Sequence, residues 1–132
     1  YGKGKKSREW RYVDDHCLAV IEICKTGNKG ESYNVGSGIN LNNINIANKI
    51  LKIAKQRINV DKKTKIKFVK DRPGHDFRYA LTSDKIKRKL KWKTKTKIDT
   101  GLIKTFNWYL NNKSFFKKFS KKLFYKRLGL KK

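Results

Sequence analysis

The apolar residues of this chain occur in short groups, and this arrangement limits the possible folds more than any other feature. Some groups alternate with polar residues, as in a half-buried strand, and others repeat with the spacing of an amphipathic helix. No apolar run approaches the roughly 18 residues that a membrane-spanning helix needs. The pattern therefore predicts a mixed α/β fold and argues against a transmembrane segment.

The chain is long enough for one domain, but its core must be small. Of its 132 residues, 37% are apolar, against about 45–50% in an average globular domain. Strands are predicted at residues 9–13, 31–35 and 66–69. Helices are predicted from an N-cap at Asp14 to Gly27, from Asn42 or Asn43 through residue 54, from Ser83 to Leu90, and from Asp99 or Thr100 through residue 110.

The net charge of +26 has two readings. A charge of this size favours polyanionic partners such as nucleic acid or an anionic membrane. Lysine, however, outnumbers arginine 29 to 7, and isoleucine and asparagine are also abundant, which a coding bias toward A/T-rich codons would produce. Specific nucleic-acid recognition relies more on arginine. The charge alone therefore does not choose between a selected surface and a compositional bias.

No catalytic apparatus or metal site is visible in the sequence. His16 and His75 are far apart, and neither belongs to a group of metal-ligating residues. Cys17 and Cys24 have helical spacing, so we expect them to pack in the core. The Gly-Ser-Gly at residues 36–38 lacks the Gly-Lys-Ser/Thr of a phosphate-binding loop.

Three places carry groups suited to an anionic, sugar-bearing ligand. Arg8 ends a glycine-rich segment, and a guanidinium can hold two phosphate oxygens. Asn34 lies near the end of a predicted strand and offers both a donor and an acceptor. Residues 71–75 place an acid, two potential cations and a flexible glycine together. The alternatives are a surface arginine, a turn-forming asparagine and a solvated loop.

The same residues belong to a longer series of motifs. The first is Tyr-Gly-Lys-Gly-Lys-Lys-Ser-Arg-Glu-Trp-Arg-Tyr-Val-Asp-Asp-His at residues 1–16. Glu-Ser-Tyr-Asn-Val-Gly follows at 31–36, and Asp-Arg-Pro-Gly-His-Asp at 71–76 with Arg-Tyr at 78–79. This order resembles the dTDP-glucose 4,6-dehydratases, whose first motif is Tyr-Gly-x-Gly-x-x-x-Arg-Asp-Trp-x-Tyr-Val-x-Asp-His. The resemblance covers about residues 1–113, and the motif at 71–79 is its most selective part.

The resemblance implies the C-terminal part of an extended short-chain dehydrogenase/reductase with a Rossmann-type fold. The chain would be mainly the small mixed α/β substrate-binding lobe, beginning partway through a domain. In this family, NAD oxidises carbon 4 of the glucose, water is lost across carbons 5 and 6, and hydride returns to carbon 6. The NAD-binding loop and the catalytic residues would precede Tyr1, so the family activity is a hydro-lyase, whereas this chain alone would be inactive.

The resemblance also implies the roles of the candidate residues. Arg8 would hold the diphosphate, Asn34 would bind substrate beside it, and Tyr1 would lie near the base. The loop that closes on the dTDP portion would consist of Asp71, Arg72, Pro73, Gly74 and His75. Residues 1–113 would form the substrate-binding unit, and residues 114–132 a basic tail able to touch anionic surfaces. The complete enzyme would be a cytoplasmic homodimer.

Three positions depart from the family pattern. Glu9 replaces an aspartate, Arg11 an apolar residue, and Lys91 a glycine. If residue 91 has a left-handed backbone, lysine there costs on the order of 1 kcal/mol. If Arg11 faces the core, its charge needs a partner. Three other identities stay open: a sister nucleotide-sugar epimerase or dehydratase, a basic module for nucleic acid or membrane, and a fragment that folds poorly.

Overall fold

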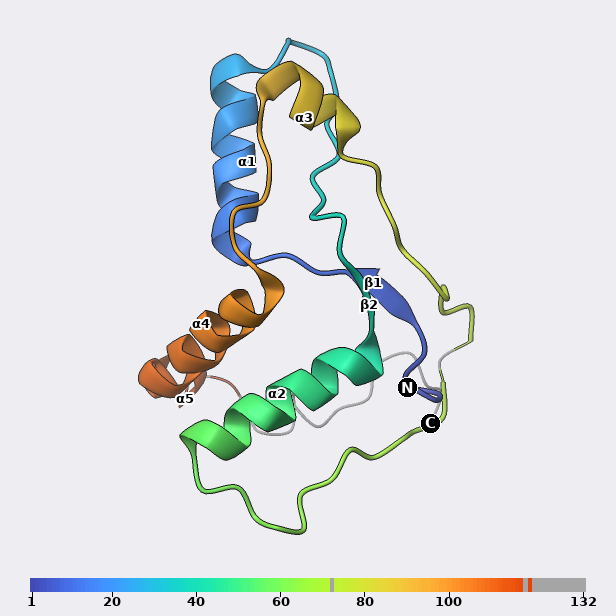
Figure 1. The fold of residues 1–132 in the computed structure, drawn as a ribbon, viewed down its shortest axis with the longest axis vertical. Helices are drawn as coiled ribbons and strands as arrows, with labels where there is room; N and C mark the ends of the chain where they lie inside the picture. The colour runs from blue at the N-terminus through green and yellow to red at the C-terminus, as the bar shows by residue number, and fades with distance from the viewer. Residues whose placement is uncertain (72, 118, 120–132) are drawn as a thin grey trace.

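The structure is a computed structural model, and it describes residues 1–71, 73–117 and 119. In chain order its elements are β1 (Ser7–Glu9), α1 (Val13–Thr26), β2 (Asn40–Asn42), α2 (Asn43–Arg57), α3 (Asp84–Leu90), α4 (Ile98–Asn111) and α5 (Lys113–Lys117). Helices α1 and α3 lie side by side at one end of the molecule, α2 packs against α4 at the other, and the strands lie between them (Figure 1).

The first strand, β1, is bordered on both sides. Strand β2 pairs with it antiparallel, and Arg8 stands opposite Leu41. On the other edge, Ser7 bridges to Arg78 in parallel orientation. There the Ser7 amide donates to the Phe77 carbonyl at 2.9 Å, and the Tyr79 amide donates to the Ser7 carbonyl at 3.2 Å. Residues far apart in the sequence therefore meet around β1.

The core is small, as the composition predicts. Its central cluster is Ala19, Val35, Ile86 and Trp92. These residues bring together α1, the segment before β2, α3 and the connection that follows α3. Much of the apolar surface of α1 is not covered, and Val13 is 59% exposed. None of the helices in the described part of the chain is both long and apolar enough to cross a bilayer.

Two of the predicted strands are wrong, and a third is displaced. Residues 31–35 and 66–69 are connections without regular structure, and the strand predicted at 9–13 is β1, three residues long and beginning at Ser7. Both edges of β1 are occupied by other segments, and an extended segment without a partner edge cannot form a ladder. The alternating apolar residues in these segments therefore indicated partly buried side chains, not strands that pair with a neighbour.

The helices are confirmed with small changes at their ends. Tyr12, not Asp14, is the N-cap of α1, and Asp14 lies in its first turn. Gly27 ends α1, and Asn42 and Ser83 precede α2 and α3, as predicted. The last long helix begins one residue before Asp99. The prediction for Cys17 and Cys24 is wrong, because both are exposed in the described structure.

Lys91 has the left-handed backbone that its position in the motif suggested, with φ 53° and ψ 14°. We expect Lys91→Gly to raise the free energy of unfolding by about 1 kcal/mol, because glycine adopts this conformation without a Cβ clash. Urea unfolding measures this change. Lys93→Gly is the control, since residue 93 has no positive φ and a glycine there should destabilise the protein. Equal effects of the two substitutions would contradict the prediction.

Candidate functional site

The loop that carries Asp71 and His75 lies against the start of the chain. The Gly2 amide donates to the Val69 carbonyl at 2.8 Å. The Lys6 ammonium forms an ion pair with Asp71 at 2.7 Å and donates to the His75 carbonyl at 2.6 Å. The structure thus brings together two segments that the sequence separates by more than sixty residues.

Tyr1 and Asp71 both contact His75, and these three residues form one cluster. The Tyr1 and His75 rings are in edge contact, with centroids 6.2 Å apart. The His75 Nδ1 lies 3.1 Å from Asp71 Oδ1. Gly2 has a φ of +55°, and a Cβ at this position would lie 3.1 Å from Asp71 Oδ2. A glycine is therefore needed where the chain passes over Asp71.

Arg8 is held by the neighbouring segment. Its guanidinium donates to the carbonyls of Ser7 at 2.7 Å and Asp76 at 2.9 Å, and more weakly to that of Phe77 at 3.4 Å. It lies 4.6 Å from the centre of the Tyr79 ring. The Tyr79 hydroxyl donates to Asp76, and this hydrogen bond raises the pKa of Tyr79. These contacts fix the position of a charged fork beside the loop.

Glu9 connects the segments on both sides of β1. Its Oε1 accepts from the Gly38 amide at 2.5 Å, and its Oε2 accepts from the Leu81 amide at 3.2 Å. Gly36 is buried against this carboxylate and against the Ser83 hydroxyl. The longer side chain at residue 9 therefore has a structural role, because one carboxylate spans two backbone segments.

Asn34 lies apart from the cluster of Tyr1, Asp71 and His75. It is exposed and lines a polar pocket of about 360 Å³ together with Ser32, Thr82, Asp84, Lys85 and Arg88. Within the described residues no hydrogen bond joins Asn34 to Arg8 or to the loop. The glycines that follow Asn34 meet Glu9, so the same carboxylate that neighbours Arg8 fixes the segment of Asn34.

An ion-pair network holds the segment before Asn34 against α3. Glu31 pairs with the Lys89 ammonium at 2.7 Å and accepts from the Tyr33 hydroxyl at 2.8 Å. These two hydrogen bonds lower the pKa of Glu31 to about 2. The carboxylate is therefore ionised at neutral pH, and it anchors one wall of the polar pocket.

The remaining loop residues are turn formers. Pro73 and Gly74 are exposed, and Gly74 has a φ of +63°. This conformation agrees with the predicted Pro-Gly turn. Arg72 lies outside the described residues.

Sequence reasoning missed three residues of the site, namely Lys6, Glu9 and Tyr79. Lys6 carried no signal of its own, because it lies in the glycine-rich segment before the predicted strand and its partner His75 is 69 positions away. Glu9 and Tyr79 stand in the family motifs, but their contacts with residues distant in the sequence could not be predicted from it.

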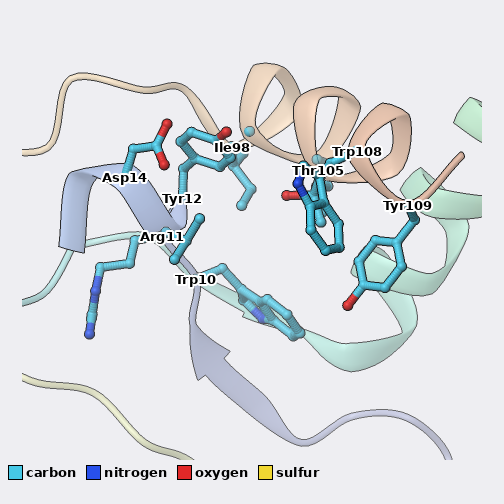
Figure 2. A pocket seen from close by; sticks show the side chains of 11 residues that line it. Trp10, Arg11, Tyr12, Asp14, Ile98, Thr105, Trp108 and Tyr109 are labelled. Carbon is cyan, nitrogen blue, oxygen red and sulfur yellow. The ribbon is translucent and has the colours of Figure 1, made fainter. Parts of the chain in front are cut away.

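A second cavity, of about 530 Å³, lies between residues 10–14 and α4. Figure 2 shows the rings of Trp10, Tyr12, Trp108 and Tyr109 around it. Arg11 points away from α4 (Figure 2). It donates to the Val35 carbonyl and lies 3.0 Å from His16 Nδ1, so two of its guanidinium nitrogens have partners, whereas its buried Nε has none among the described residues. The cavity is largely apolar, unlike the region around Arg8.

The groups around Arg8 are suited to binding an anion. A guanidinium, an ammonium and a histidine lie beside a carboxylate and an aromatic ring, which suits a phosphate-bearing ligand with a flat, polar base. No group of three or more His, Cys, Asp or Glu in the described part of the chain could hold a metal ion.

Comparison with known proteins agrees with these features. A family model described as GDP-mannose 4,6 dehydratase matches residues 1–105. The chain is 40% identical over 125 residues to a dTDP-glucose 4,6-dehydratase of Escherichia coli, covering 89% of this chain and 34% of that protein. It is 43% identical over 133 residues to a probable dTDP-glucose 4,6-dehydratase of Sinorhizobium fredii, covering 98% of this chain and 38% of that protein.

Solved structures show the same relationship. The dTDP-glucose 4,6-dehydratase of Bacillus anthracis, in complex with NAD, superposes with a TM-score of 0.77 at 33% identity, over 89% of this chain and 35% of that one. The corresponding enzyme of Streptomyces venezuelae, with NAD and TYD bound, gives 0.78 at 34% identity, over 87% of this chain and 34% of that one.

The chain spans about a third of the length of these relatives. The predicted fold class is confirmed, because the superposed structures are extended short-chain dehydrogenase/reductases with Rossmann-type folds and the present chain covers part of them. The resemblance found in the motifs is also confirmed, since relatives with that name match over most of the chain. The chain belongs to the family that is described as GDP-mannose 4,6 dehydratase and includes the dTDP-glucose 4,6-dehydratases.

Proposed function

We propose that this chain is the dTDP-binding portion of a dTDP-glucose 4,6-dehydratase. The observation that carries the proposal is the contact between the start of the chain and the loop of Asp71 and His75, with Arg8 fixed beside it. Two segments with the family's motifs thus form one cationic and aromatic surface. A basic module that binds nucleic acid or membrane through its charge alone would not require these two segments to be in contact.

The roles follow from the chemistry of each group. Arg8 holds the diphosphate, because a guanidinium presents a planar fork of donors to phosphate oxygens. Tyr1 and the loop from Asp71 to His75 surround the base, including Arg72, Pro73 and Gly74. Asn34 contributes from the neighbouring polar pocket, where its amide serves both as donor and as acceptor.

The residues described here do not fit an NAD site. Gly2 and Gly4 lead into the strand β1, whereas the glycines of a dinucleotide fingerprint form the turn between a strand and the helix that directly follows it. In the proposal, NAD and the catalytic groups for oxidation, loss of water and return of hydride belong to the other two-thirds of the complete protein. This chain alone then binds nucleotide without turning it over.

The uncovered apolar surfaces agree with a larger protein. The apolar side chains Leu18, Val20 and Ile21 of α1 are all more than 40% exposed, and so are the two aromatic residues of α4 beside the larger cavity. In the proposal these surfaces pack against the rest of the Rossmann-type fold. The complete enzyme is a homodimer in the cytoplasm, and its basic tail, most of which lies outside the described residues, is free to touch anionic surfaces.

The test is a titration of the chain with dTDP, UDP and random duplex DNA, each at two salt concentrations. We expect saturable dTDP binding that is tighter than UDP binding and moderately sensitive to salt. A preference for UDP would favour a sister nucleotide-sugar enzyme. DNA binding with a steep salt slope and no dTDP preference would favour the basic module. Circular dichroism on the same sample shows whether the chain is folded, and a folded chain that does not bind dTDP would contradict the proposal.

A further inference from the structure

Lys6 is the cation of this site to which neither the motifs nor the family resemblance assigns a role. We propose that Lys6 is a positioning residue that holds the loop of residues 71–75 in its nucleotide-binding form before any nucleotide arrives. The inference rests on the proposed function for the identity of the ligand, but its structural part stands on contacts within the chain.

The Lys6 ammonium joins the two ends of the loop. It forms an ion pair with Asp71 Oδ2 at 2.7 Å and donates to the carbonyl of His75 at 2.6 Å. The Pro73–Gly74 turn lies between these two attachment points. One side chain therefore closes the turn into a ring, and its charge offsets the repulsion between a carboxylate and a carbonyl that face the same atom.

Burial makes this contact stronger than an ordinary surface pair. The Lys6 side chain is only 13% exposed, against 37% for Lys49 in its pair with Asp99. Exposed ion pairs contribute little to stability, whereas a partly buried pair is less screened by water and salt. Removing Lys6 would also leave the Asp71 carboxylate without its shortest ion pair among the described residues.

The position of Lys6 on the chain explains why it acts together with Arg8. Lys6 directly precedes β1 and Arg8 lies within it, and both side chains contact the segment that borders β1. Lys6 donates to the carbonyl of residue 75, and Arg8 donates to those of residues 76 and 77. These two cations thus fix three consecutive carbonyls. In the proposed function Arg8 holds the diphosphate, and Lys6 fixes the loop that surrounds the base.

This arrangement predicts a preorganised loop. A loop that is already ordered loses less conformational entropy when a ligand binds, and its affinity rises accordingly. If Lys6 orders the loop, then replacing Lys6 weakens nucleotide binding because the loop becomes less ordered, and not because the net charge of the chain changes.

The test compares Lys6→Met with Lys5→Met. Both remove one positive charge at neighbouring positions, but Lys5 is exposed. Amide hydrogen exchange of Gly2, Ser7 and Tyr79, whose amides donate the backbone hydrogen bonds between the start of the chain and the segment of the loop, is measured first, without nucleotide. We expect exchange about tenfold faster in Lys6→Met and unchanged in Lys5→Met, because the opening of the loop no longer breaks the two Lys6 contacts. We then expect the dTDP dissociation constant to rise about tenfold in Lys6→Met and less than twofold in Lys5→Met.

Each outcome has one meaning. Unchanged exchange in Lys6→Met would overturn the inference, and so would an equal loss of dTDP affinity in both variants, which would show an effect of net charge. Faster exchange in Lys6→Met with no dTDP binding in any variant would keep the positioning role and reject dTDP as the ligand. If Lys6→Met does not fold, Lys6→Gln replaces it, since the amide can still donate to the His75 carbonyl but carries no charge.

Discussion

Arg8→Ala is expected to weaken dTDP binding on the order of a hundredfold, which is the largest effect on binding that the structure predicts. Two losses combine. The diphosphate loses its charged fork, and the carbonyls of Asp76 and Phe77 lose the donor that holds their segment beside β1. Removing one partner of a hydrogen-bonded charge pair commonly costs about 2–5 kcal/mol. Isothermal titration with dTDP measures the change.

The matched control is Arg78→Ala. Arg78 is an exposed arginine in the segment that borders β1, so its removal changes the net charge equally without touching Arg8. We expect it to change dTDP affinity less than threefold. Arg8→Lys separates charge from geometry, because lysine keeps the charge but not the fork. Binding that survives in Arg8→Ala but falls in Arg78→Ala would show that the anion site has been placed wrongly.

Gly36→Ala is expected to lower the free energy of unfolding by about 2–3 kcal/mol, which is the largest stability effect of those proposed. A Cβ on residue 36 would lie 2.4 Å from Glu9 Oε1 and 2.6 Å from the Ser83 hydroxyl oxygen. The carboxylate cannot move aside freely, because it accepts hydrogen bonds from the Gly38 and Leu81 amides. Urea unfolding followed by circular dichroism measures the loss.

Gly38→Ala is the matched control for this substitution. A Cβ at residue 38 meets nothing within 4 Å, so the only cost there comes from its positive φ of +76° and should stay near 1 kcal/mol. Glu9→Ala provides the second check, since without this carboxylate much of the clash disappears and the effects of the two changes should not add. If Gly36→Ala is no worse than Gly38→Ala, the close approach of these segments is not as the structure shows.

The helices of this protein could be predicted from its sequence, whereas its strand pairing could not. Apolar spacing located the ends of α2, α3 and α4 within three residues, because helical hydrogen bonds are local. The strand β2, Asn-Leu-Asn, is only three residues long, and an alternation this short does not distinguish a strand from a loop. It is a strand because β1 lies beside it, and that neighbour comes from more than thirty residues earlier. Pairing of this kind is a tertiary property.

The candidate site was also predicted only in part. Motif order located Arg8 and the loop of Asp71 and His75, which the structure brings to one place. Burial of the cysteines was predicted from helical spacing alone, and this failed because the side of α1 that carries them is not covered in the described chain. A periodic pattern shows which residues share one face of a helix, but it does not show whether another part of the protein covers that face.

The sequence separation within the site has a consequence for how the protein is made. Lys6 and Arg8 meet carbonyls that follow them by 68 and 69 positions in the chain. Synthesis adds roughly 5–20 residues each second, so these cations leave the ribosome several seconds before their acceptors exist. Helices α1 and α2 lie between and can form in that interval from local contacts. The nucleotide site is thus completed only after α1 and α2 can form, and a nascent chain that stalls before residue 71 has these two helices but no site.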